Sequence, residues 1–486
     1  MTDKNTHNKI FKSISIFGSV QAIQMVCKII SVKITSVILG PSGVGLIGII
    51  DNVINLITQG SSFGIQTIGT QLIAKDRTDK NNQKVLGFWM LICGFFAGVF
   101  CFAFSGFLSQ ITFDTNAYSL HFKALSVYFI FYSLINFAII LLKGLNEIKR
   151  LVQYQIFSTI LISAATISCY VLWGINGIFP AFIANSLVAF LVYAVYLFKL
   201  DLRSVSIQKS EILSQGKYLF SKGSLLALNG VFGLICFFII RKYLQENNPD
   251  YLGFYEAANL YLVAYFGIIF TSLANDYFPT LTHKVSQKEE INSFVNIQIQ
   301  TTLLITTPLV LIMYFGYDLI IPFLTSSNFL PVREILLFGL VSILCKTINY
   351  PLGYIVLAID DTKSYFYQNI IGDILNVVLI LILFHFFGLI GIGLAMFLQY
   401  FGFNFYLLYF VSKRKLFWPD SKSSKYLLIS LLLAFIMIGS ELLFWNSEII
   451  LYITKGITML IGVIYCIFEL NKNNQFISAI KRKLKK

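Results

Sequence analysis

The chain has 486 residues, of which 57% are hydrophobic and only 12% are charged. Soluble globular domains carry about 25% charged residues, so this composition excludes an ordinary water-soluble protein and indicates a surface that faces lipid. The net charge of +14 would suggest a nucleic acid partner in a soluble protein. Here the distribution of the basic residues gives them a different use, and we expect no nucleic acid partner.

Apolar stretches long enough to cross a bilayer follow one another along the chain. Each has about 20 residues or more, which matches a hydrocarbon core of about 30 Å at a rise of 1.5 Å per helical residue. Backbone groups in lipid need partners within their own segment, so these stretches are expected to be helices. We place fourteen spans at roughly 14–38, 44–66, 85–107, 119–142, 151–172, 175–198, 218–240, 251–273, 294–317, 332–358, 365–386, 389–411, 426–445 and 449–470.

Lysine and arginine are sorted into alternate gaps between these spans. The gaps on one side, together with both ends of the chain, hold 28 of the 37 basic residues, whereas the gaps on the other side hold only Arg241 and Lys242. Loops on the cytoplasmic side of a membrane are the ones enriched in basic residues. The pattern therefore predicts a multi-pass membrane protein with an even number of spans and with both termini in the cytoplasm.

The sequence repeats itself weakly after six spans. Residues 44–47 open the second span and precede Asp51, and residues 252–255 open the eighth span and precede Glu256. Chance similarity among helices rich in leucine, isoleucine and phenylalanine is the alternative, but the lengths and charges of the gaps repeat as well. Six-helix units that face the same way are a known transporter plan, with the substrate site between the halves.

The predicted fold is therefore an all-α integral membrane protein with two six-helix lobes in a pseudo-two-fold arrangement and two further helices at the C-terminal end. The tail carries apolar residues four apart among lysines, which fits either an amphipathic basic helix on an anionic membrane surface or a disordered charged end. We divide the chain into an N-terminal lobe (1–200), a C-terminal lobe (201–412), two extra transmembrane helices (413–470) and a basic cytoplasmic tail (471–486).

Four lysines inside the spans are the main candidates for a substrate site. A charged residue at membrane depth costs on the order of 2.5–3.5 kcal/mol on insertion scales, so it seldom persists without a cavity, a partner or a role. Lys28 lies near the middle of the first span and could flank a wide cavity with Lys33, and Lys346 lies in the middle of the tenth. Lys222 lies near the cytoplasmic end of the seventh span, where snorkelling is the simpler explanation. Internal ion pairs are the alternative for the others.

Acidic residues inside the spans are candidates for coupling to a proton or sodium gradient. We single out Asp51, Glu256 and Asp373, which would serve either as coupling groups or as counter-ions to nearby lysines. Glu441 and Lys455 lie on adjacent helices outside the repeat, where a structural pair is the simpler interpretation.

The remaining motifs point away from an enzyme and from a metal site. All seven cysteines lie within spans and none forms a CxxC pair, so we expect neither a metal site nor another cofactor. The chain has no phosphate-binding GxxxxGK[ST] motif, so energy for transport would come from an ion gradient or from the membrane potential. The external gaps are short, which disfavours a membrane polymerase or ligase, and we assign no catalytic residues.

The stretch at residues 39–48, Leu-Gly-Pro-Ser-Gly-Val-Gly-Leu-Ile-Gly, follows a span that contains lysines and precedes a span that contains asparagine. It resembles the corresponding part of bacterial Wzx-type polysaccharide flippases, the O-antigen translocases of the multidrug/oligosaccharidyl-lipid/polysaccharide exporter superfamily. The resemblance implies alternating access by two lobes and transfer of an undecaprenyl-diphosphate-linked oligosaccharide across the bacterial inner membrane. Related flippases line their central cavity with cations from the first and seventh helices, which correspond here to Lys28, Lys33 and Lys222.

The same resemblance implies lipid-linked oligosaccharide and membrane lipids as partners, and it leaves open contacts with a polysaccharide polymerase and the chain-length machinery. A diphosphate carries about two negative charges, so lysines in a cavity of low dielectric would attract it strongly. The main alternative is a multidrug or cation antiporter of the same superfamily. That activity favours an acidic cavity, and the lysines of spans 1 and 10 argue against it.

Overall fold

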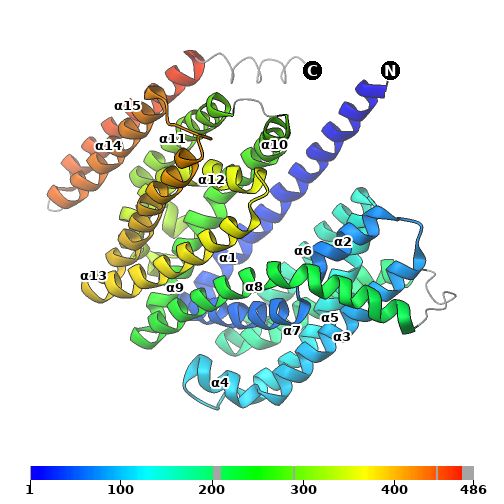
Figure 1. Cartoon of the computed structure of the whole chain (residues 1–486). Coiled ribbons are helices and arrows are strands. Elements are labelled where there is room, and N and C mark those ends of the chain that lie inside the picture. Colours follow the sequence, from blue (N-terminus) through cyan, green and yellow to red (C-terminus); the bar gives the residue numbers. More distant parts are fainter. Residues whose placement is uncertain (1, 201–208, 288–290, 445–446, 473–486) are drawn as a thin grey trace. The chain divides into compact units, whose positions relative to one another are not determined.

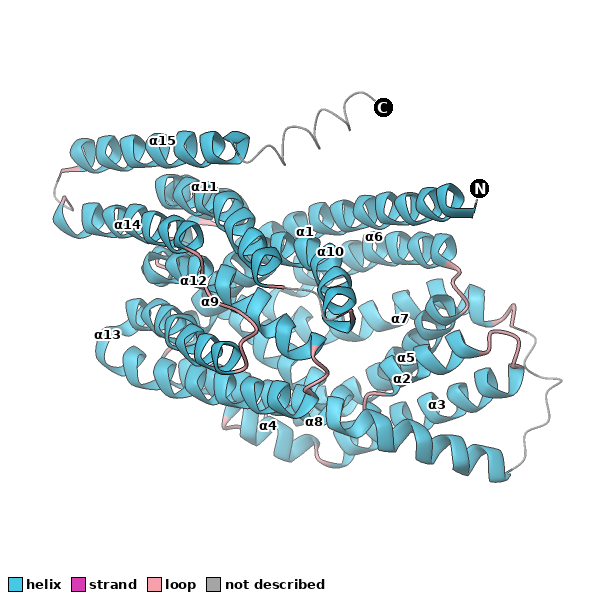
Figure 2. Cartoon of the chain, turned by 45° about the horizontal axis from the view of Figure 1, so that its top comes forward, coloured by secondary structure: helices cyan, strands magenta, loops and turns pink. Residues whose placement is uncertain are grey.

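The computed structural model describes residues 2–200, 209–287, 291–444 and 447–472. Every element in this part of the chain is helical (Figure 2). The helices are α1 (Thr2–Ser62), α2 (Ile65–Lys75), α3 (Lys80–Ala103), α4 (Ser105–Phe113), α5 (Ser119–Gly144), α6 (Ile148–Trp173), α7 (Ile178–Leu197), α8 (Lys209–Asn247), α9 (Pro249–Asn259), α10 (Phe266–Ser286), α11 (Asn292–Leu324), α12 (Val332–Ala358), α13 (Thr362–Lys413), α14 (Ser421–Leu443) and α15 (Glu448–Lys472). Three short helical segments complete this part of the chain: the 3-10 helices η1 (Gly174–Gly177) and η3 (Ser327–Phe329), and the π-helix η2 (Leu260–Tyr265) between α9 and α10.

Eleven helical segments among the described residues are long and apolar enough to cross a membrane. Three of these segments (24–62, 148–197 and 363–413) each overlap two of the spans expected from the sequence. Each of the fourteen expected spans therefore overlaps one of the eleven segments, and the predicted all-α, multi-pass fold is confirmed. The basic tail lies outside the described residues beyond Lys472, so its two interpretations stay open.

Glycine breaks the two longest helices at the predicted boundaries between spans. Gly40 in α1 has φ 65° and Gly388 in α13 has φ 57°, a backbone conformation that costs other L-residues energy and glycine almost none. Pro41 follows the first break and cannot supply the backbone N–H that an uninterrupted helix would need. Each of the two helices is therefore a pair of spans joined by a tight turn.

Two joints in the second half of the chain repeat two joints in the first half at the same distance. α5 ends at a turn with Asn146 at φ 61°, and α12 ends at a turn with Asp360 at φ 60°. In both turns the next residue, Glu147 or Asp361, donates its backbone N–H to the carbonyl five residues earlier, as in the Schellman motif that closes many helices. The second turn lies 214 residues after the first (360 against 146).

A second pair of turns shows the same offset. Gly174 and Gly388 have φ 54° and 57° with ψ −133° and −137°, and they are also 214 residues apart. Three positions later, Gly177 and Gly391 each pack so tightly against the carbonyl eight residues earlier that a β carbon would not fit. Two six-span units with matched joints explain why these glycines recur, in agreement with the repeat that the sequence indicated.

Contacts divide the chain into two compact units, residues 1–249 and residues 250–486. In unit 1, α3 lies beside α5, and α5 also packs against α2 and α7 (Figure 1). The helix α8 packs against α1, α2 and α3, so its contacts place it in unit 1. The boundary predicted at residue 200 depends on the sequence repeat rather than on these contacts, and it stays a prediction. Fully buried side chains of α2, α3 and α5, including Ile73, Leu86 and Leu141, form the core.

In unit 2, α12 packs along α13, and α11 contacts α12, α14 and α15. Polar contacts fasten the two extra helices to α11 near its start and along its length. Gln300 Nε2 donates to the carboxylate of Asp420 at 2.9 Å, and the hydroxyls of Thr307 and Ser430 are 2.7 Å apart. The two extra helices are therefore an integral part of unit 2.

Towards the other end of α11, Lys455 of α15 forms a buried ion pair with Glu441 of α14. The two side chains are 1% and 9% exposed. The ammonium group also donates to the Tyr317 hydroxyl at 3.2 Å and lies 4.6 Å from the centre of that ring. The pair that the sequence suggested is present.

A capping residue joins the two ends of α13. Asp361 accepts hydrogen bonds from the backbone N–H and the hydroxyl of Ser364 at 3.0 and 2.7 Å and pairs with Arg414 at 2.7 Å. The hydrogen bonds from Ser364, and then Arg414, lower the pKa of the Asp361 carboxyl to about 2.

Candidate functional site

The predicted cationic residues of unit 1 lie on two helices. On α1, Lys28 is exposed and Lys33 is half-buried, and on α8 Lys222 is exposed. Within the described residues, Lys28 and Lys222 form no ion pair with an acidic side chain. Lys33, in contrast, interacts with another group of the protein. Lys28 and Lys222 therefore have no counter-ion in the part of the chain that the structure describes.

Lys346, the predicted cation of unit 2, lies in an aromatic cage. It is half-buried in the middle of α12. Its ammonium group lies 5.3 Å from the centre of the Phe270 ring and 5.7 Å from that of Tyr400, distances at which ring faces attract cations. No carboxylate partner of Lys346 is found in the described part of the chain. The cage holds the charge in place without neutralising it.

The three acidic candidates have different surroundings. Asp51 is exposed on α1 and accepts a hydrogen bond from Asn55 Nδ2 at 2.9 Å. Glu256 on α9 is half-buried and has an interaction of its own. Asp373 is half-buried on α13, directly after Gly372, whose carbonyl accepts from Gln399 Nε2 at 3.1 Å. Asp51 shares unit 1 with Lys28, Lys33 and Lys222, whereas Glu256 and Asp373 share unit 2 with Lys346. Their grouping around one cavity stays a prediction.

A polar pocket in unit 1 was not predicted from the sequence. It has a volume of about 220 Å³ and lies where the chain breaks between α1 and α2. Phe63 and Gly64 form the break, with φ 46° and 72°. The pocket is lined by Asn55, Thr58, Gln59, Ser62, Gly64, Gln66, Thr67, Tyr132 and Ala227. None of these side chains is charged.

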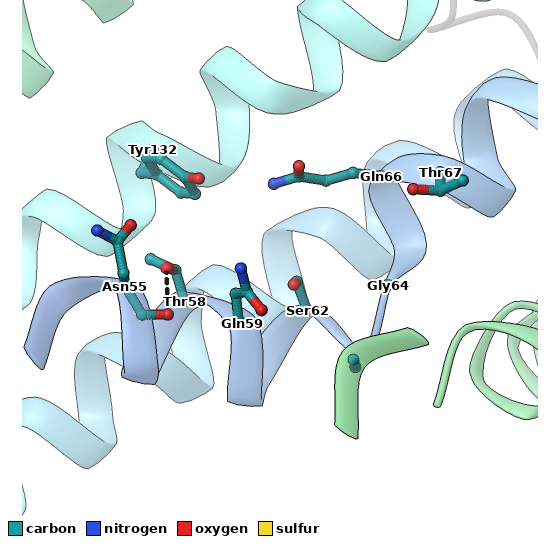
Figure 3. A pocket seen from close by; sticks show the side chains of 9 residues that line it. Asn55, Thr58, Gln59, Ser62, Gly64, Gln66, Thr67 and Tyr132 are labelled. Carbon is teal, nitrogen blue, oxygen red and sulfur yellow. Dashed lines mark hydrogen bonds between the residues drawn. The ribbon is translucent and has the colours of Figure 1, made fainter. Parts of the chain in front are cut away.

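Helical spacing places several of the lining residues on one wall. Thr58 and Gln59 lie three and four residues after Asn55 on α1, and Ser62 lies four and three residues after them, which puts all four on the same face. Figure 3 shows the Gln66 side chain of α2 reaching from the other side of the break towards Tyr132 of α5. Amide and hydroxyl groups from three helices therefore surround one space.

Most of these polar groups have no hydrogen-bond partner among the described residues. The side chains of Gln59, Ser62, Gln66, Thr67 and Tyr132 form no hydrogen bond and no ion pair in that part of the chain, and the Tyr132 ring stacks on that of Tyr128. Thr58 is engaged, because its hydroxyl donates to the Asn55 carbonyl at 3.0 Å. Each free amide or hydroxyl can both donate and accept, so the pocket is suited to an uncharged ligand rich in hydroxyl groups, or to water.

Close backbone packing holds the break beside α8. A β carbon on Gly64 would lie 2.6 Å from the carbonyl oxygen of Gly223, and one on Gly223 would overlap the Phe63 carbonyl. The ring of Phe220 completes this contact, 5.4 Å from the ring of Phe63. Lys222 precedes Gly223, so its backbone lies next to the edge of the pocket.

Trp89 of α3 anchors α8 on the same side. Its indole N–H donates to the Ile212 carbonyl at 3.0 Å, and its ring lies 5.1 Å from that of Phe220. The one sequence signal for the pocket is a run of small polar residues at 58–62, Thr-Gln-Gly-Ser-Ser. The run contains no charged residue, so it lacks the feature that marks the lysines and acids inside the spans as unusual.

Comparison with known proteins identifies relatives of the whole architecture. Residues 34–334 match the family described as Polysaccharide biosynthesis protein. The structure of the lipid II flippase MurJ in an inward closed conformation aligns over 94% of this chain and 99% of its own, with a TM-score of 0.72 and 16% identity. An inward-facing multidrug resistance MATE transporter of the MOP superfamily aligns over 81% and 95%, with a TM-score of 0.65 and 15% identity. No curated protein matches the sequence. At these identities the likeness shows the fold.

Proposed function

Since the chain belongs to the polysaccharide biosynthesis protein family, we propose that it is a flippase for a lipid-linked oligosaccharide. The proposed cargo is an undecaprenyl-diphosphate-linked repeat unit of O-antigen or a related polysaccharide. The proposed location is the bacterial inner membrane, with both termini in the cytoplasm as the distribution of basic residues predicts. The protein would move this lipid rather than modify it, and its partners would be the lipid-linked substrate, membrane lipids and the downstream polymerase.

The observation that carries this proposal is the position of Lys346. Within the described residues it is a cation in the middle of a membrane-spanning helix without a carboxylate partner, held by two rings. A protein seldom keeps an uncompensated charge at this depth unless the charge serves a ligand or a pathway. A diphosphate is a ligand of the opposite sign, and it cannot cross lipid without its charge being matched.

In the proposed mechanism, the lysines bind the diphosphate while the protein alternates between inward-open and outward-open forms. Lys28, Lys33 and Lys222 would contribute from unit 1 and Lys346 from unit 2. The sugars would pass through water in the cavity, and the prenyl chain would remain in lipid. The lipid II flippase whose fold this chain shares supports such an assignment, because lipid II is also a lipid-linked saccharide.

A multidrug or cation antiporter is the second candidate, since the MATE transporter aligns over most of the chain. A cationic drug requires an acidic or neutral cavity, and Lys28 and Lys346 without acidic partners would repel it. Export of a cationic dye by the purified protein in liposomes, without movement of polyprenyl diphosphate lipids, would favour the antiporter.

The flippase proposal is tested by changing Lys346. Lys346→Met removes the charge but keeps the length and apolar body of the side chain, so we expect loss of surface polysaccharide in cells with normal amounts of inserted protein. Lys346→Arg keeps the charge and its contact with the rings, and it should retain part of the activity. Normal export by Lys346→Met, at equal membrane levels, would remove the cation from the mechanism.

We further propose that transport is coupled to a proton or sodium gradient through one of the three acids. In proteoliposomes, the transport rate of one of three variants should no longer respond to an imposed gradient: Asp373→Asn, Glu256→Gln or Asp51→Asn. That variant should still exchange the lipid slowly, at a rate that does not depend on the gradient. Equal rates with and without either gradient in the unchanged protein would refute coupling and leave the concentration difference of the lipid as the driving force.

A further inference from the structure

We propose that the polar pocket beside Gly64 binds the sugar that is bonded directly to the diphosphate, and that it prefers an uncharged sugar ring. This inference rests on the proposed flippase function and assigns a subsite to it. The predicted cation sites concern the phosphate part of the cargo, and they leave open how the protein recognises the saccharide.

The chemistry of the lining is the first argument. The pocket contains amides and hydroxyls from α1, α2 and α5, and no charged side chain. Gln59, Ser62, Gln66, Thr67 and Tyr132 all keep their polar atoms free of other partners within the described residues. Gln59 and Thr67 are exposed and the other three are half-buried, so these polar groups are open to pair with a ligand or with water. A sugar ring suits them, since each of its hydroxyls both donates and accepts.

The size and shape of the pocket agree with a single ring. At roughly 30 Å³ for each water molecule in the liquid, a cavity of about 220 Å³ would hold about seven waters, which is close to the volume of one hexose. The Tyr132 side chain closes the wall opposite α1 (Figure 3). An aromatic side chain with a free hydroxyl offers both an apolar face and a hydrogen bond to a sugar.

The position of the pocket links it to the phosphate. Gly64 lines the pocket, and its backbone packs against Gly223, directly after Lys222. The first sugar of the cargo is bonded to the diphosphate, so a lysine one residue from the glycine that packs against this pocket would suit the phosphate part of the same ligand. Broken helices mark binding sites in many transporters, because their turns free the backbone near a cavity.

The test compares two lipids in the full-length protein reconstituted into nanodiscs. Undecaprenyl diphosphate carries no sugar, and undecaprenyl-diphosphate-linked N-acetylglucosamine carries one neutral ring. With the radiolabelled lipids, we expect the unchanged protein to bind the sugar-bearing lipid about tenfold more tightly. The double variant Gln66→Leu/Tyr132→Phe should lose this difference and bind the sugar-free lipid as before. Tyr132→Phe alone removes one oxygen atom, so it keeps the test valid if the double variant does not fold. Its affinity for the sugar-bearing lipid should fall at least threefold.

A matched control changes an exposed amide of unit 1 away from the pocket. Gln153→Leu on α6 alters an exposed side chain and should preserve the difference between the two lipids. Equal affinity of the unchanged protein for both lipids, or an undiminished difference in the pocket variants, would overturn the inference and leave the pocket as a site for water only. The flippase proposal would survive that result, provided that Lys222→Met still weakens binding of the sugar-free lipid. Failure of the protein to bind either lipid would instead refute the flippase proposal, and the subsite with it.

Discussion

Breaking the ion pair between Lys455 and Glu441 should destabilise unit 2 more than any change of an exposed charge. Both side chains are almost fully buried, and the Tyr317 hydroxyl also accepts a hydrogen bond from the ammonium. Lys455→Met keeps the volume but leaves the Glu441 carboxylate without its counter-charge. Removal of one partner of a buried pair typically costs about 3–5 kcal/mol.

The expected loss can be converted into a melting temperature. For a domain of 150–250 residues, 1 kcal/mol shifts the Tm by roughly 2–4 °C, and unit 2 covers residues 250–486. We therefore expect Lys455→Met to lower the Tm of the detergent-purified protein by on the order of 10 °C. The double variant Lys455→Met/Glu441→Leu removes both charges, so no buried charge is left without a counter-charge. It should therefore recover most of the lost Tm.

Thermal unfolding followed by tryptophan fluorescence and by aggregation measures both variants. Lys425→Met on α14 is the control, since Lys425 is exposed and should change the Tm by no more than a degree or two. The reasoning would be refuted if Lys455→Met had the same Tm as the Lys425→Met control. It would also be refuted if the double variant were no more stable than Lys455→Met alone. Normal stability with lost transport would instead assign the pair to the transport pathway.

Two further predictions concern close packing and a capping charge. Gly223→Ala places a β carbon against the Phe63 carbonyl, so it should impair transport and reduce the yield of folded protein. Gly267→Ala is the control, because the space around its α carbon is open. It should behave as the unchanged protein in size-exclusion chromatography and export assays. For Asp361, whose pKa is lowered from 3.8 to about 2, the stabilising contribution is present above pH 4 and lost as the pH falls through about 2. The Tm advantage over Asp361→Asn should shrink across that interval, and an advantage that stays constant down to pH 2 would contradict this origin.

Composition, span length and the sorting of basic residues were sufficient to predict the fold, because lipid imposes the same requirements on every helix. The six-span repeat and the Glu441–Lys455 pair could also be predicted, since spacing and opposite charge are visible in the sequence. Lys346 could be identified as unusual by its depth alone. Its aromatic cage could not, because Phe270, Lys346 and Tyr400 lie on three different helices.

The polar pocket escaped prediction for a related reason. It depends on a break at Phe63–Gly64 that is stabilised by the approach of Gly223, about 160 residues further along the chain. No local pattern indicates which glycines will meet. Gln59 and Gln66 also look like ordinary polar residues near the end of a span, and only the arrangement around them shows that they share one space.

The offset of 214 residues shared by these two joints has a consequence for what each hairpin tolerates. From the turn at Asn146 to Gly174, and from the turn at Asp360 to Gly388, the number of residues is the same. One inserted residue would rotate everything after it by about 100° around the helix axis and move the following glycine away from its turn. The two hairpins can therefore differ widely in their side chains, whereas neither can change in length without losing its closing glycine. Exchanging residues 146–177 with residues 360–391 would ask whether the two hairpins are interchangeable.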